Sequence, residues 1–207
     1  MRIAAVLLLL LVLPACWGPR LFMPREHVAA VGPDGDPAAL YVVAVTTDAS
    51  QPARTGEVRI WSHGARALFT EDDREIVELY VGFELENNCD VPLRLDLASV
   101  TCEQLAIDGV VHGPLQPKAF SGDGEARPRT TTRVDVVFEP PAEAPQRIDG
   151  FSIRFVVRAG SDEAAREALV QVTPFGPYEP YDPYYHDPWG PYWGFGFGVG
   201  WSSHHCH

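Results

Sequence analysis

The sequence predicts an all-β fold, an antiparallel sandwich of about seven or eight strands between residues 38 and 173. Two observations lead to this prediction. Apolar residues recur with a period of two almost throughout, which is typical of strands with one face in a core and one in water. The apolar runs are also short and separated by turn residues, as in sandwiches. The only helical candidate, SDEAAREAL at 161–169, is too short to change the fold class.

The clearest strand is EIVELYVGFELENN, residues 75–88. Its apolar residues fall on one face, namely Val77, Leu79, Val81, Phe83 and Leu85. The other face is mostly polar and consists of Glu78, Tyr80, Gly82, Glu84 and Glu86. The turn residues Asn87, Asn88, Cys89 and Asp90 end the run. We therefore expect the first face to point into the core.

Other strands follow the same alternation. They are expected at 93–97, 133–139 and 151–158, with weaker ones at 40–46, 57–62 and 166–173. Asp108-Gly109 lies between the apolar runs QLAI and VVHG and predicts a two-residue hairpin turn.

The stretch FELENNCDVPLRLDLASV resembles immunoglobulin-type domains of bacterial envelope lipoproteins. In those domains a strand commonly ends in Asn-Asn and a Pro-Leu pair opens the next strand. The resemblance covers residues 75–158. It implies an immunoglobulin-like sandwich and no particular activity, because sandwiches perform many functions.

The N-terminus predicts export. Arg2 precedes an apolar run of 11 residues, 3–13, which is shorter than the roughly 20 residues that cross a bilayer. A basic start, a short apolar core and small residues at its end indicate a secretory signal peptide over residues 1–15.

Leu13-Pro14-Ala15-Cys16 resembles the lipobox of bacterial lipoproteins. The resemblance implies cleavage before Cys16, three acyl chains on that residue and stable anchoring without a membrane span. Trp17 differs from the Asp of inner-membrane retention signals, so the expected location is the outer membrane, facing the periplasm. The alternative is an ordinary signal peptide with a cysteine near the cut.

The net charge limits the classes of partner that we expect the protein to bind. The formal net charge is −12, and the mature chain is one unit more acidic because residues 1–15 include Arg2. Such a surface repels nucleic acid, so we expect no nucleic-acid partner. Prolines and glycines punctuate the segment after the signal peptide, which predicts a tether. The expected organisation is a signal peptide (1–15), a lipidated tether (16–37), a sandwich (38–173) and a tail (174–207).

If Cys16 is lipidated, three cysteines remain: Cys89, Cys102 and Cys206. The export signal implies an oxidising compartment, where Cys89–Cys102 is the natural disulfide and would stabilise the fold by about 3 kcal/mol. The bond requires the chain to bend near Ala98-Ser99. The alternative is two separately buried thiols.

The tail is compositionally distinct. It holds 11 of the 22 aromatic residues and no Lys or Arg. Prolines recur every third residue from 174 to 183, as do Tyr178, Tyr181 and Tyr184, so a polyproline II rod would align them. These tyrosines, with Trp189 and Trp193, are candidate contacts for an envelope protein or the cell wall; the alternative is a disordered spacer.

Glycines alternate with Phe195, Phe197, Val199 and Trp201 near the end of the tail. An extended chain here would be an apolar ribbon. It can pack on the sandwich, lie at the membrane surface or self-associate, and the sequence does not choose.

The chain ends in His204-His205-Cys206-His207, four residues of the type that bind zinc or copper. No recognisable nucleophile or carboxylate accompanies His63 or His112, which we interpret as exposed loop histidines, and no G-x-S-x-G or H-E-x-x-H motif occurs. The sequence thus predicts a non-enzymatic envelope lipoprotein that binds or supports another component and needs no cofactor. The alternative is a metal-binding protein using its C-terminal cluster.

Overall fold

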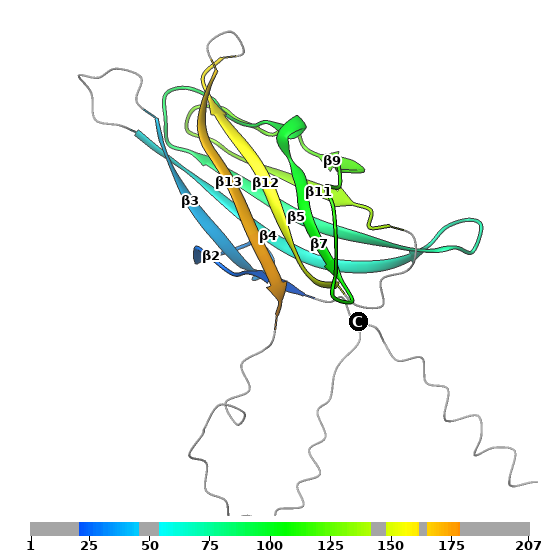
Figure 1. Cartoon of the computed structure of the whole chain (residues 1–207). Helices are drawn as coiled ribbons and strands as arrows, with labels where there is room; N and C mark the ends of the chain where they lie inside the picture. The colour runs from blue at the N-terminus through cyan, green and yellow to red at the C-terminus, as the bar shows by residue number, and fades with distance from the viewer. Residues whose placement is uncertain (1–20, 46–53, 142–147, 162–164, 179–207) are drawn as a thin grey trace, which may run out of the picture.

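The computed structural model describes residues 21–45, 54–141, 148–161 and 165–178. These form two antiparallel sheets that pack face to face (Figure 1). The predicted fold class, an antiparallel β-sandwich, is therefore confirmed. The described residues contain 13 strands, more than the seven or eight expected, because several edge strands are only two to four residues long.

The six-stranded sheet is built around three long strands. Its order is β2 (Val28–Val31), β3 (Pro37–Val45), β4 (Arg54–Phe69), β5 (Glu75–Asn87), β11 (Thr131–Phe138) and β9 (Ala119–Ser121). The alternation predicted for 75–88 is confirmed, since Leu79, Val81, Phe83 and Leu85 are fully buried.

The seven-stranded sheet is built around β12, which has different partners along its length. Its order is β1 (Phe22–Pro24), β13 (Arg166–Pro177), β12 (Ile148–Ala159), β6 (Leu93–Leu95) and β10 (Glu125–Ala126). The first part of β12 also pairs with β7 (Thr101–Ile107), which forms a hairpin with β8 (Val110–His112). The predicted turn at Asp108-Gly109 closes that hairpin, and both residues have positive φ angles.

The core lies between the sheets and contains residues from both. Phe83 of β5 packs edge-on against Phe155 of β12, with ring centroids 5.3 Å apart. Tyr41 of β3 reaches across in the same way and donates or accepts a 2.8 Å hydrogen bond with Thr173 of β13. Burial raises the pKa of the Tyr41 phenol. The predicted core faces at 134–138 and 151–157 are also buried.

The predicted tether differs from the structure. Residues 22–24 and 28–31 lie in β1 and β2 and pair with β13 and β3. Phe22 is buried, and its ring meets that of Phe151 edge-on at 5.2 Å. Short apolar runs between prolines and glycines resemble a linker in sequence, yet here they pair with neighbouring strands, and Phe22 is buried in the core.

The helical candidate at 161–169 was also wrong where the structure describes it. Residues from Arg166 onward form β13 and pair with β12 through Ala159. Local helix propensity is a weak preference that pairing with a neighbouring strand readily outweighs.

No disulfide joins Cys89 to Cys102, which corrects the predicted pairing. Cys89 follows β5, whereas Cys102 lies in β7 opposite Ile153 of β12. Between them along the chain lie β6 and the 3-10 turn Leu97–Ser99. Both thiols are buried, and burial raises the pKa of Cys102 to about 12.

Candidate functional site

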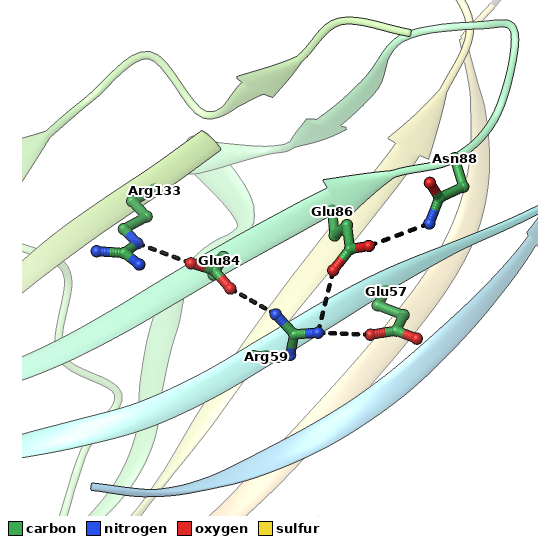
Figure 2. Close-up of polar contacts among 6 residues, drawn as sticks. All are labelled: Glu57, Arg59, Glu84, Glu86, Asn88 and Arg133. Atoms are coloured by element: carbon green, nitrogen blue, oxygen red, sulfur yellow. Dashed lines mark hydrogen bonds and ion pairs between the residues drawn. The ribbon is translucent and has the colours of Figure 1, made fainter. Parts of the chain in front are cut away.

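The outer face of the six-stranded sheet carries a connected group of charged side chains (Figure 2). We call Glu57, Arg59, Glu84, Glu86 and Arg133 the charged face. Strand alternation turns these residues away from the core. The register then sets Glu84 of β5 between Arg59 of β4 and Arg133 of β11.

Each oxygen of Glu84 accepts a hydrogen bond from an arginine. Arg59 Nη1 donates to one oxygen at 2.6 Å and Arg133 Nε donates to the other at 2.7 Å. Arg59 Nη2 also contacts Glu57 at 2.7 Å and Glu86 at 3.0 Å. Asn88 donates to the second oxygen of Glu86 at 3.3 Å. A single guanidinium therefore links three carboxylates on two strands.

Electrostatics keeps this network ionised. Burial of the Glu84 carboxyl would raise its pKa, but the hydrogen bonds from Arg133 and Arg59 outweigh burial and hold the pKa below its ordinary value. Burial likewise opposes the charge of Arg59, whose pKa is nevertheless raised by its bonds to Glu84 and Glu86. The charged face thus stabilises the strand register, with its buried carboxylate satisfied within the fold.

Trp61 is buried on the same outer face, outside the main core. Its ring lies over Gly82 of β5, where an added Cβ would meet ring atoms at 2.3 Å. Gly32, in the turn between β2 and β3, also lies against the ring, and a Cβ added there would be 3.0 Å from ring atoms. As a result Trp61 is only 1% exposed. Trp61, Gly82 and the turn at Gly32 thus form a small second core on the outer face of the sheet.

His63 extends this second core with polar contacts. Trp61 Nε1 donates to His63 Nε2 at 2.9 Å. Oxygens of Asp36 and Asp34 lie 3.5 and 3.7 Å from His63 Nδ1, and Asp135 lies 3.5 Å from Nε2. The interpretation of His63 as an exposed loop residue was wrong, because it lies within β4 and its side chain is 20% exposed. Its Nε2 therefore accepts a hydrogen bond from the indole within the fold.

Among the described residues, no group of three or more His, Cys, Asp or Glu side chains is arranged to hold a metal ion. A shallow hollow of about 540 Å³ beside the 3-10 turn is lined in part by Arg94 and Arg158. These arginines form ion pairs with Glu125 and Asp96 respectively. Their charges are therefore already balanced within the hollow.

One side of the sandwich has an open strand edge. β1 pairs with β13 only at Phe175–Pro177, and Arg25 donates its backbone N–H to the Pro174 carbonyl at 2.8 Å. Backbone groups alternate in direction along a strand, so those of Val172 and Val170 also point away from β12. Within the described residues, their one hydrogen bond on that side is local, from the Gln171 side chain to the Val172 carbonyl at 3.3 Å.

The six-stranded sheet is open on the same side. β2 pairs with β3 only as far as Ala39, and the Leu40 N–H donates to the His27 carbonyl. By the same alternation, Val42 and Ala44 direct their backbone groups outward. The bond between Tyr41 and Thr173 keeps the two edges together, and Figure 1 shows β3 and β13 side by side. We call the edges 40–45 of β3 and 166–173 of β13 the open side.

Exposed apolar side chains accompany the open side. Val170 and Val172 of β13 are 48% and 38% exposed, and Val42 of β3 is more exposed still. Sequence reasoning did not single out these residues. The available signal was the run ALVQVT at 168–173, which holds neither the charge nor the proline that commonly protects an edge strand.

Most residues predicted from sequence to form sites lie outside the described residues. These are Cys16, Tyr181, Tyr184, Trp189, Trp193, His204, His205, Cys206 and His207. The signal peptide and residues 179–207 of the predicted tail also lie there. The start of the tail was predicted at residue 174, which is wrong because residues 174–177 belong to β13. Tyr178 is described, and its backbone N–H donates to the Leu21 carbonyl at 2.9 Å. No described segment forms a helix long and apolar enough to cross a bilayer.

Comparison with known proteins found no match: no family model, no curated protein and no solved structure matches the chain. Function is therefore argued from the residues and geometry above.

Proposed function

We propose that this protein is an envelope lipoprotein anchored in the bacterial outer membrane through Cys16, acting as a non-catalytic binding or structural module. The observation that best supports a binding role is the open side. Two neighbouring edge strands expose backbone donors and acceptors together with apolar side chains. Such edges bind partners by adding an extended segment as a further strand.

The charged face is a weaker candidate for a binding surface. Its buried carboxylate is already bonded to two arginines, so a ligand would have to replace hydrogen bonds that exist within the fold. At Val170 and Val172, in contrast, an added strand would gain backbone hydrogen bonds without breaking a ladder. This difference favours the open side.

Capture from envelope extract tests the binding role. The full chain carrying Val170→Lys and Val172→Lys is compared with the parent and with a Val110→Lys, Val111→Lys control. The control valines are exposed on β8 and receive the same added charge. We expect partners captured by the parent to be lost with the first variant and kept with the control. Equal capture by all three proteins contradicts the role of the open side.

The anchor has its own test. Replacing Cys16 by alanine removes the sulfur that would carry acyl chains, so the variant is expected to leave the membrane fraction. If it sediments with membranes as the parent does, the lipoprotein part of the proposal is wrong.

A further inference from the structure

The edge of β13 needs a cover that the described residues do not supply. Ala168–Thr173 is uncharged and proline-free, and such a bare edge is prone to pair with another strand. Ala168 and Leu169, together with Val45 of β3, are only partly buried against the core. An added strand would therefore satisfy backbone groups and also exclude water from apolar side chains.

The chain itself leaves the sheet beside this edge. β13 ends at Pro177, and the bond from the Tyr178 N–H to the Leu21 carbonyl keeps residue 178 next to β1. β1 pairs with residues 175–177 of β13, on the same edge that is open at residues 166–173. The 29 residues that follow Tyr178 thus start on the open side.

One segment of those 29 residues matches the edge. GFGFGVGW, residues 194–201, is uncharged, and no proline follows Pro191, so every N–H in it can donate. It has eight residues, the same length as the open stretch 166–173. Its apolar residues all fall on one face of an extended chain, where they can cover Leu169 and Val45. Burial of its large apolar side chains favours docking and offsets the entropy cost of ordering glycine.

The connection is long enough. Fifteen residues separate Tyr178 from Gly194, and an extended chain of that length spans up to about 50 Å. At roughly 3.3 Å per residue, the open edge lies between about 17 and 40 Å from Tyr178 along β13. The segment can therefore reach the whole open edge.

We propose that residues 194–201 add as a strand to the open edge of β13 in the same chain. The inference rests on the open side proposed above as the binding surface, and it states what occupies that edge in the resting protein.

Hydrogen exchange of the full chain tests this proposal. The readout is exchange at the Val170 and Val172 amides, which face the edge and have no partner within the ladder of β12 and β13. Phe197→Pro with Gly198→Pro removes two adjacent donors from the segment, whichever direction it runs. The control, Ser202→Pro with Ser203→Pro, adds two prolines just outside it. Amides of β5 report that the sandwich is intact.

We expect both amides to exchange at least about tenfold faster in the Phe197→Pro, Gly198→Pro variant than in the parent and the control. Equal exchange in all three proteins overturns the proposal. Protection that weakens on dilution also overturns it, because the covering strand would then come from a second copy.

These measurements involve no partner. Failure here leaves the capture experiment at Val170 and Val172 as an independent test of the binding role. Conversely, loss of the binding role does not alter the exchange result.

Discussion

Two regions of the molecule differ in how their polar groups are hydrogen-bonded. They are the outer face of the six-stranded sheet and the open side of the sandwich. On the outer face, Glu84 is bonded by two arginines, and the ring of Trp61 is enclosed by glycines. On the open side, Val170 and Val172 direct backbone groups away from the sheet beside exposed valine side chains. The polar groups of the outer face are hydrogen-bonded within the fold. The backbone groups of the open side would gain such bonds only from an additional strand.

This contrast teaches where to look for binding in a sandwich without a pocket of recognisable chemistry. Charged residues are easily recognised in the sequence as candidate binding residues. In the charged face, however, they are paired across strands and stabilise the fold. The inconspicuous run ALVQVT leaves its hydrogen-bonding capacity open.

The largest effect is expected at Trp61. Trp61→Ala should lower the free energy of unfolding by about 3–5 kcal/mol, the range for a buried aromatic residue, although Trp61 lies outside the main core. The control is Phe69→Ala in the same strand, where the ring is 73% exposed and the expected change is within about 0.5 kcal/mol. Urea denaturation measures both. Similar values for the two variants would show that the second core does not stabilise the sheet.

The next effect compares neighbouring residues of β13. Gln171→Pro removes an N–H that faces β12 and should destabilise the protein by about 2–3 kcal/mol. Val172→Pro removes an N–H that faces the open edge, as Pro174 naturally does, and should cost about 1 kcal/mol or less. Thermal unfolding of the two variants measures the difference. An equal or larger loss for Val172→Pro would contradict the assignment of which N–H groups of β13 face β12.

Within the charged face, burial should separate two glutamates on one strand. Glu84→Gln leaves two arginines without their carboxylate and should cost about 2 kcal/mol. Glu86→Gln should cost less than about 1 kcal/mol, because the Glu86 side chain is 38% exposed against 11% for Glu84. Chemical denaturation at neutral pH provides both values. Equal losses would argue against a special role for the buried carboxylate.

The same residue predicts a pH dependence. The pKa of Glu84 in the folded protein lies below its ordinary value of 4.5. Its stabilising contribution is therefore complete above pH 4.5 and is lost as the pH falls through the folded pKa. Unfolding measured between pH 6 and 3 should show a smaller loss of stability in Glu84→Gln than in the parent. Parallel curves for the two proteins would contradict this assignment.

No change is expected from reducing agents. Cys89 and Cys102 are not bonded to each other, so adding dithiothreitol should leave the midpoint of thermal unfolding within about 1 °C. Cys102 should also resist alkylation at pH 8, since burial raises its pKa to about 12. A drop of several degrees under reduction would contradict this expectation and indicate a disulfide.

Sequence patterning predicted β5, β11 and β12 well, because an apolar residue recurs at every second position along them, whereas β4 was expected only at 57–62 and extends over Arg54–Phe69. It placed Glu84, Glu86 and Arg133 on outer faces. It did not predict that Glu84 lies between Arg59 and Arg133, since cross-strand register depends on partners far along the chain.

Short elements escaped prediction for a different reason. β1 and β2 have too few residues to show a period, and their strand state follows from docking of Phe22 and pairing with β3. Trp61 interrupts the polar side of β4 and is explained only by Gly82 on the neighbouring strand. The open side is likewise a property of which edges lack a partner, which no local pattern encodes.

The bond between Tyr178 and Leu21 has a mechanical consequence. Residues 21 and 178 leave the sheet at the same end of an antiparallel pair. Tension that pulls these two points apart therefore loads the hydrogen bonds between β1 and β13 one after another, like a zipper, and not all together in shear. Under such a load β1 would peel away first while the rest of the sandwich stayed folded, and the full length of the β13 edge would become accessible.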